Sequence, residues 1–299
     1  MSQFLSVLLC TRNRAAKLRR ALESILANSY RDFELVVVDQ STDGQSRRNV
    51  ESFEDERLVY VPTDTVGLSR ARNIAVRAAR SDIVVFTDDD CVCDRDWLRS
   101  IAAEYERDPG VMGVFGRVVA YGDGRPGMHC PCLIEATERR TVDAPAVPQR
   151  VLGAGNNMSF RKEVFYRIGL FIESLGAGTR MKAGEDTEFV YRALRQRLKF
   201  VYSPAPLVYH DNWSSLAQYP PLARSYIRGS SAAYTKFALQ LDGTASKELL
   251  RTGYYILSNR LGAGSVYKAL GGFLVGCMAG IGYVLAPPPR LAARPRAAD

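Results

Sequence analysis

The chain has 299 residues, of which 46% are hydrophobic and 24% charged, a composition typical of a globular protein with one large domain or two ordinary ones. Its six cysteines follow no disulfide framework of secreted proteins, and its first residues lack the basic start of a signal peptide. We therefore expect a cytoplasmic protein with reduced cysteines.

The net charge of +8 is concentrated in the last part of the chain. Residues 213–299 contain ten Lys or Arg and three Asp or Glu, a net charge of +7, so the preceding residues are close to neutral. This asymmetry predicts an anionic partner for residues 213–299. The chain has no zinc-finger, homeodomain or RNA-binding motif, which argues against nucleic acid, and the apolar content of the region favours an anionic membrane surface.

Short apolar runs alternate with amphipathic segments at the start of the chain. Buried strands are predicted over residues 5–10, 34–39, 57–61 and 83–86, and helices over residues 15–28 and 67–80. Because continuously apolar strands alternate with helices, they predict a parallel sheet covered on both faces. Ligands of such sheets bind at the carboxyl ends of strands, where this chain has "TRNR", "DQSTDG" and "TDDDC".

The elements after residue 110 are less regular. We expect a pair of strands over 110–122, a surface excursion over 122–149, and a strand with a short helix over 153–171. A glycine-rich loop leads to a helix that begins at about Glu185, and residues 199–210 predict one or two strands ending at His210. The chain from Trp213 onward is predicted to be helical, except for the terminal "APPPRLAARPRAAD", which is expected to be disordered.

Three consecutive aspartates, Asp88, Asp89 and Asp90, follow the predicted strand over 83–86, and Asp39 ends an earlier strand. Adjacent carboxylates repel one another and resist desolvation. Alone, they could cap the helix that follows and interact with its dipole. Together with Asp39 they favour a Mg²⁺ or Mn²⁺ site, because these ions bind a few carboxylates plus phosphate oxygens. Asp90 could act with Asp88 or with Asp89, while a nucleotide diphosphate supplies the remaining ligands.

Six segments follow one another along the chain: "LSVLLCTRNR", "ELVVVDQSTDG", "GLSRARNIAV", "VVFTDDDC", "GNNMSFRKEVF" and "GEDTEFVYRALR". In this order and spacing, over residues 4–210, the chain resembles the family 2 glycosyltransferases. It is most similar to the bacterial non-processive type, because the Gln-x-x-Arg-Trp motif of processive synthases is absent.

The resemblance implies an α/β protein of GT-A fold, with a Rossmann-like, nucleotide-binding, mostly parallel sheet flanked by helices and a C-terminal helical tail. It implies a catalytic domain over 1–212. The nucleotide-binding half would extend to about residue 110, and the acceptor-binding half would cover 111–212. Residues 213–299 would then form a basic helical region that can associate with a membrane.

The resemblance also implies which residues bind the donor and acceptor. Those that line the nucleotide pocket would be Thr11, Asn13 and Arg14. Asp39 would accept a hydrogen bond from the base, in many members a uracil. Those near the nucleotide and its diphosphate would be Arg72, Asn73, Asp88 and Asp89. The metal ligands would be Asp88 and Asp90, and the donor sugar or acceptor would be bordered by Asn156 and Asn157.

The Glu185-Asp186 pair matches the acidic pair that lies by the acceptor in the family, and we expect Asp186 to be the general base with Glu185 beside it. Inverting transfer needs a carboxylate that takes the acceptor's proton, and cations that stabilise the leaving diphosphate. The resemblance thus implies Mn²⁺- or Mg²⁺-assisted transfer from a nucleotide sugar, with a UDP-sugar favoured, to a sugar, lipid-linked or small-molecule hydroxyl. His210 could complete the metal site or be a structural histidine.

The sequence argues against two other enzyme classes and leaves one alternative function open. The segment "CTRNRAAK" has no glycine, which argues against both a sugar-nucleotide pyrophosphorylase and a Gly-x-Gly-x-x-Gly dehydrogenase. A non-catalytic protein of the same fold that binds a nucleotide sugar or carbohydrate stays open. The cysteines in "CVC" and "HCPC" lack the usual zinc-ligand spacing, so we expect ordinary thiols.

The uncharged segment over 269–286 has two interpretations. Its length is at the lower limit for crossing a bilayer, and Gly272, Gly276 and Gly280 form a face that permits close helix contact in membranes. We favour association with the inner face of the plasma membrane, either peripheral or by one span. The alternative is a glycine-rich helical hairpin packed on the catalytic domain.

Overall fold

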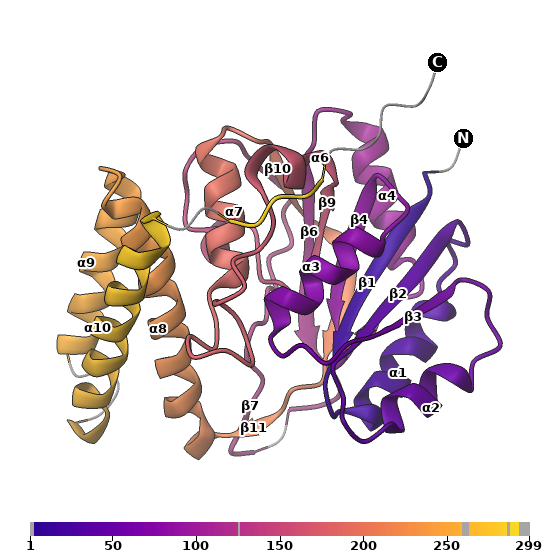
Figure 1. Cartoon of the computed structure of the whole chain (residues 1–299), viewed down its shortest axis with the longest axis horizontal. Coiled ribbons are helices and arrows are strands. Elements are labelled where there is room, and N and C mark those ends of the chain that lie inside the picture. The colour runs from indigo at the N-terminus through magenta and orange to yellow at the C-terminus, as the bar shows by residue number, and fades with distance from the viewer. Residues whose placement is uncertain (1–2, 125, 259–262, 286–287, 293–299) are drawn as a thin grey trace.

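The computed structural model describes residues 3–124, 126–258, 263–285 and 288–292. This part of the chain is built on a nine-stranded sheet with helices on both faces, and a group of C-terminal helices lies at one end (Figure 1). The strand order is β3-β2-β1-β4-β9-β6-β10-β5, with β8 paired to β10, and β7 and β11 form a separate two-stranded sheet. The α/β fold with a C-terminal helical tail, expected from the sequence, is confirmed.

The strands are β1 (Leu5–Thr11), β2 (Phe33–Asp39), β3 (Leu58–Pro62), β4 (Ile83–Asp88), β5 (Cys91–Cys93), β6 (Gly113–Ala120), β7 (Met128–His129), β8 (Arg140–Val142), β9 (Asn157–Arg161), β10 (Phe200–His210) and β11 (Ser214–Ser215). The helices are α1 (Ala15–Leu26), α2 (Gln45–Glu51), α3 (Leu68–Ala78), α4 (Trp97–Arg107), α5 (Pro148–Val151), α6 (Glu163–Ile168), α7 (Glu185–Arg195), α8 (Tyr219–Ala238), α9 (Gly243–Leu257) and α10 (Ala263–Leu285), and η1 (Leu216–Gln218) is a 3-10 helix.

The first four strands form the parallel part of the sheet, as predicted. β1 lies between β2 and β4, and β2 pairs with β3. In this register Thr11 lies opposite Asp39, and Cys10 lies opposite Asp88. The polar residues that end these strands are therefore gathered at one edge of the sheet. The short helix α2 was not predicted, because it buries only Ser46 and Val50 and so has little apolar periodicity.

The second half of the sheet is mixed. β9 is antiparallel to both β4 and β6, while β10 is parallel to β6 and antiparallel to β5. The strand pair expected over 110–122 is wrong, because the segment forms one strand, β6. Gly113 and Gly116 lie within that strand, where Phe160 and Asn157 fill the space that larger side chains would need.

The helices cover the sheet because successive strand residues point to opposite faces. Leu5, Val7 and Leu9 of β1 belong to the apolar core beneath α1 and α4. Leu8 belongs to the core on the other face, which α3, α6 and α7 cover. Both faces of the parallel strands are thus buried, which explains their continuously apolar sequence.

The C-terminal helices pack on one another and on α7. A Cβ at Gly276 would overlap the main-chain oxygen of Arg228, and one at Gly280 would lie 2.5 Å from that of Ala232. The Gly-x-x-x-Gly face of α10 therefore contacts α8, within the same chain. On the other side of α8, Lys236 donates to the buried carboxylate of Glu188 on α7 over 2.7 Å. The predicted division of the chain after residue 212 stays a prediction.

The segment after α10 returns to the sheet domain. The main-chain nitrogen of Leu170 donates to the oxygen of Pro289 over 2.7 Å, and Leu291 packs on the core beneath α7. The expected disorder of the terminal segment is therefore wrong for residues 288–292. Residues 259–262, 286–287 and 293–299 lie outside the described part of the chain.

The close contact of α10 with α8 gives a matched pair of substitutions. Gly276→Ala should lower the free energy of unfolding by about 1–3 kcal/mol, because the added methyl overlaps the main chain of α8. Gly282→Ala meets open space on the same helix, so it should leave this quantity unchanged or raise it by up to about 1 kcal/mol. Urea denaturation of both variants measures the difference, and equal stability would contradict the described packing.

Candidate active site

Arg14 bridges two of the three aspartates that follow β4. Its Nη1 lies 2.7 Å from Asp89, its Nη2 lies 2.6 Å from Asp90, and Thr11 donates to Asp89 over 2.7 Å. Both carboxylates are buried. Burial raises the pKa of Asp89 to about 7, and the attraction of Arg14 offsets only part of this rise. Arg14 itself stays partly exposed, so it can reach a ligand at this edge.

Arg72 on α3 joins this edge of the sheet to the start of α7. Its guanidinium is buried and lies 3.4 Å from Asp88 and 3.0 Å from Glu185, and it donates to the main-chain oxygen of Gly155. Burial raises the pKa of Asp88, and the Arg72 charge acts in the opposite direction. Asp88 is partly exposed, which leaves its carboxylate accessible from solvent.

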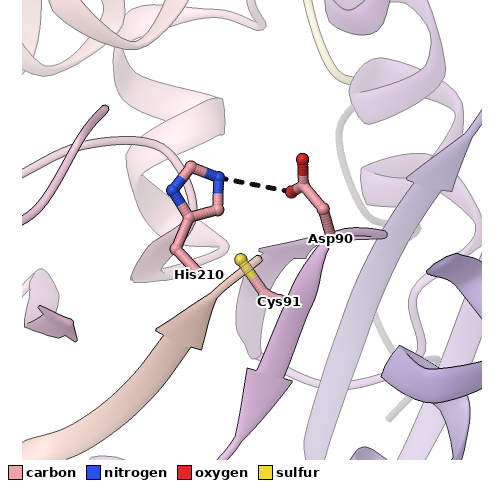
Figure 2. A group of neighbouring side chains, drawn as sticks. All are labelled: Asp90, Cys91 and His210. Carbon is pink, nitrogen blue, oxygen red and sulfur yellow. Dashed lines mark ion pairs between the residues drawn. The ribbon is translucent and has the colours of Figure 1, made fainter. Parts of the chain in front are cut away.

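His210 ends β10 and turns its ring toward Asp90 (Figure 2). Its Nε2 lies 3.4 Å from the Asp90 carboxylate, and its Nδ1 lies 2.9 Å from the oxygen of Pro131. A carbonyl can only accept, so Nδ1 carries a hydrogen. Burial lowers the pKa of His210, but the hydrogen bond and charge of Asp90 outweigh it and raise the value, which favours a protonated ring that donates from Nε2 to Asp90. Burial raises the pKa of Asp90, but His210 and Arg14 outweigh it and lower the value to about 2.

Asp90, Cys91 and His210 form the one group of possible metal ligands found in the described residues, with ligand atoms within 4.8 Å of one another. Cys91 lies opposite His210 in the β5–β10 pair. Burial raises the pKa of the Cys91 thiol well above its usual value, which disfavours the thiolate that a metal requires. A metal ion between Asp90 and His210 would take the place of the Nε2 proton, and a carboxylate with an imidazole nitrogen suits Mn²⁺, so these residues fit a divalent metal.

Glu185 and Asp186 begin α7. The Asp186 carboxylate accepts hydrogen bonds from the main-chain nitrogens of Gly155, at 3.0 Å, and Thr187, at 2.6 Å, and stays partly exposed. Burial raises the pKa of Glu185 to about 7, Asp186 adds to the rise, and Arg72 opposes it. The two carboxylates thus differ, with Glu185 buried against an arginine and Asp186 open to solvent.

The loops after β1 and β2 are joined by hydrogen bonds. The main-chain nitrogen of Asn13 donates to Ser41, and the Asn13 side chain accepts from the nitrogen of Thr42. Asp39 is buried and accepts from Ser41 and from the Tyr60 hydroxyl, each at 2.8 Å. These contacts hold Asn13 and Asp39 beside Thr11 at the edge of the sheet.

The three predicted asparagines differ in what they contact. The amide of Asn73 bonds the main chain of Phe171 and the carboxylate of Glu173. Asn157 accepts from the indole of Trp97 and donates to two main-chain oxygens. Neither amide points a free group at the aspartates. The buried amide of Asn156, in contrast, has no hydrogen-bond partner among the described residues.

The comparisons with known proteins agree with this arrangement. The sequence profile of Glycosyl transferase family 2 matches residues 6–169, which is more than half of the chain. The chain belongs to glycosyl transferase family 2.

Two curated relatives of this family 2 chain illustrate its range. It is 28% identical over 233 residues to "Pre-mycofactocin glycosyltransferase" of Mycobacterium tuberculosis, covering 76% of this chain and 46% of that protein. It is 26% identical over 179 residues to "Glucosyl-dolichyl phosphate glucuronosyltransferase" of Haloferax volcanii, covering 57% of this chain and 56% of that protein. The chain thus spans about half the length of these relatives.

Solved structures share the fold. The mannosyltransferase PcManGT from Pyrobaculum calidifontis, in complex with GDP-Man and Mn²⁺, superposes with a TM-score of 0.61 at 22% identity, covering 96% of this chain and 81% of that one. Residues 1–349 of S. aureus TarS superpose with a TM-score of 0.62 at 17% identity, covering 94% and 83%.

Two groups at the site of this family 2 chain are main-chain atoms that sequence reasoning missed, the nitrogen of Gly155 and the oxygen of Pro131. No side chain in the sequence signals these main-chain groups. His210, in contrast, was a candidate ligand, and the pairing of β5 with β10 places it beside the aspartates. All six cysteines are free in the structure, and their redox state stays a prediction.

Asn156 and Asn157 are neighbours that should respond differently to truncation. Asn157→Ala should lower the free energy of unfolding by about 2–4 kcal/mol, because it leaves the Trp97 indole and two main-chain oxygens without their partner. Asn156→Ala removes no hydrogen bond and should cost less than about 1 kcal/mol. Urea denaturation measures both, and an equal loss would show that Asn156 has a structural partner.

Proposed function

We propose that the chain is an inverting glycosyltransferase that moves a sugar from a nucleoside-diphosphate donor, a UDP-sugar, to an acceptor hydroxyl. The observation that carries this proposal is the buried Arg72, which contacts Asp88 at the end of β4 and Glu185 at the start of α7. The Arg72 guanidinium thus connects the acidic edge of the sheet with the Glu185-Asp186 pair. A diphosphate bound at that edge and a general base in that pair would therefore lie close enough to act on the same sugar carbon, C1.

The donor would lie across the carboxyl ends of β1, β2 and β4. Its base would meet Asp39 and the loop at Asn13, and its diphosphate would approach Arg14 and Arg72. Both arginines carry charge that a diphosphate can use, and Arg14 is exposed enough to leave Asp89 for it. In support of a nucleotide-sugar donor, the structurally similar mannosyltransferase holds GDP-Man. The choice of uracil is our own proposal from the family resemblance.

A divalent cation, Mn²⁺ or Mg²⁺, would be held by Asp90 and His210, with Asp88 on its accessible side. When bound, it supplies positive charge that stabilises the developing negative charge of the diphosphate. In its absence, Arg14 neutralises part of the same carboxylate group. The mannosyltransferase neighbour contains Mn²⁺, which supports this choice.

Transfer would proceed by direct displacement. The acceptor oxygen attacks C1 of the sugar, the bond from C1 to the diphosphate oxygen breaks, and Asp186 takes the proton of the acceptor. Attack opposite the leaving group inverts the configuration at C1. Arg72 stabilises the departing charge and keeps Glu185 beside the base. Asn156 could bond a hydroxyl of the sugar or acceptor, because its amide has no partner in the described protein.

The acceptor would be a hydroxyl of a sugar, a lipid-linked intermediate or a small molecule. One helix in the described residues, Val266–Val284, is long and apolar enough by length and composition to cross a membrane. This supports association with a membrane, where a lipid-linked acceptor would be available. That the chain works in the cytoplasm, at the inner face of that membrane, is part of the proposal.

Asp186→Asn tests the general base. The amide keeps the shape of the side chain but cannot take a proton, so kcat should fall roughly 10²–10⁴-fold. The shift in melting temperature that UDP-sugar causes should stay the same, because Asp186 does not contact the donor edge. The exposed Glu106→Gln, on α4 away from the donor edge, is the control and should keep full activity. Full transfer by Asp186→Asn would refute the assigned base, and donor binding without transfer by the native chain would favour a binding protein.

Metal removal tests the proposed ligands. Titration calorimetry should detect Mn²⁺ uptake in the presence of UDP, and a chelator should abolish the stabilisation that UDP-sugar gives. Asp90→Asn and His210→Ala should each weaken Mn²⁺ uptake at least about tenfold, because each removes a direct ligand and even the outer-shell partners of metal ligands typically contribute that much. Uptake that is unchanged in both variants, or absent in the native chain, would overturn the metal site.

A further inference from the structure

Exposed apolar side chains are concentrated on α9 and α10, at the end of the molecule away from β1–β3 (Figure 1). Seven of them are between 53% and 83% exposed: Leu250, Tyr254, Leu257, Tyr267, Leu274, Met278 and Ile281. We call their surface the outer face. Soluble monomers rarely expose so many large apolar side chains together, so this face is expected to meet a partner.

The outer face is a regular feature of both helices. On α10, Tyr267, Leu274, Met278 and Ile281 recur at intervals of seven, four and three residues and so lie along one side. The opposite side of α10 carries the glycines that contact α8. One side of α10 therefore packs against α8, and its apolar side is left uncovered.

On α9, Leu250, Tyr254 and Leu257 likewise follow helical spacing, while Ala245 and Ile256 face inward. Exposed cations lie among these apolar residues. Lys247 and Arg251 are three or four residues from Leu250 and Tyr254, which places them on the same side of the helix.

The acidic residues of this region are fewer than its cations. Lys268 on α10 is also exposed, whereas the acidic residues of the region are Glu248 on α9 and Asp242, which is paired with Arg195. Apolar and tyrosine side chains mixed with Lys and Arg are typical of helices that lie in the surface of an anionic bilayer.

We propose that the outer face of α9 and α10 docks on an anionic lipid bilayer, with both helices lying in the plane of the membrane surface. The apolar side chains would enter the boundary between headgroups and acyl chains. The cations would contact lipid phosphates. This occupant matches both the apolar content and the positive charge of the face.

In-plane docking is favoured over a transmembrane span by what α10 packs against. α8 carries Arg224, Arg228 and Lys236, and α10 contacts it through Gly276 and Gly280. A span would either carry these charges into the hydrocarbon, which costs several kcal/mol, or break the close contact with α8. Docking by the outer face requires neither.

A second copy of the chain fits the outer face less well. A symmetric dimer would bring the same surface of each copy together. Lys247, Arg251 and Lys268 of one copy would then meet those of the other, with few acidic residues to pair with them. The positive charge thus favours lipid over self-association.

Docking in this way would also orient the proposed active site. Gly229 of α8 packs against Gly184, the residue before Glu185, so the helices beneath the outer face touch the start of α7. If the proposed function holds, a lipid-linked acceptor would reach Asp186 from the membrane side. The docking itself depends only on the outer face.

Co-sedimentation of the full chain with vesicles tests the proposal without donor or acceptor. Binding to phosphatidylcholine vesicles with about one-third phosphatidylglycerol should exceed binding to pure phosphatidylcholine at least about tenfold, and salt should weaken it. Leu274→Glu with Met278→Glu should reduce binding at least about tenfold, since it places two carboxylates in the apolar face. The control, Phe4→Glu with Tyr166→Glu, changes two exposed aromatics elsewhere and should bind like the native chain.

Two further measurements keep the outcomes distinct. Met278→Trp and Tyr267→Trp should be quenched most by lipids brominated near the headgroup, whereas strong quenching of Met278→Trp by lipids brominated at the acyl end would indicate a span. Sedimentation velocity gives the oligomeric state. A native dimer that Leu274→Glu with Met278→Glu converts to a folded monomer, with no vesicle binding by either, would overturn the proposal. If the native chain binds vesicles but transfers no sugar, the result would count against the proposed function and leave the docking proposal intact.

Discussion

The buried guanidinium of Arg72 is the contact on which the arrangement of the site depends. It lies over the rings of Phe86 and Phe171 and contacts carboxylates from β4 and α7, which are far apart in the sequence. A buried charge is stable only when it is paired and hydrogen-bonded. The position of α7 relative to the sheet is therefore set by the same interaction that supplies positive charge to the proposed reaction.

At the acidic edge of the sheet, in contrast to Arg72, buried carboxylates are only partly compensated by nearby positive charge. Burial raises the pKa of Asp88 and Asp89, so holding both as carboxylates costs folding free energy. Arg14 compensates for part of this cost, and a divalent cation with a diphosphate would compensate for more. Functional carboxylate clusters commonly destabilise the folded protein on their own, and their ligands remove part of that cost.

The sequence predicts the parallel half of the sheet well because its signals are local. Continuous apolar runs mark β1, β2 and β4, and the rule that ligands bind at their carboxyl ends brings Thr11, Asp39 and Asp88 together. The single strand β6 could not be predicted, since its partners β9 and β10 come later in the chain. The asparagines show the same limit, because whether an amide is free or engaged depends on residues far away, such as Trp97 for Asn157.

The C-terminal helices are held to the sheet domain by charge rather than by apolar packing alone. Glu188 is fully buried on α7, and its carboxylate is bonded by Arg192 of the same helix and by Lys236 of α8. Separating α8 from α7 would leave Glu188 without one of its two cations, which costs about 3–5 kcal/mol in comparable buried pairs. Because α10 packs closely on α8, the outer face, α8 and α7 should move as one body. A surface that docks on a membrane would then fix the direction in which Glu185 and Asp186 face, since the same helix α7 carries Glu188 and the acidic pair.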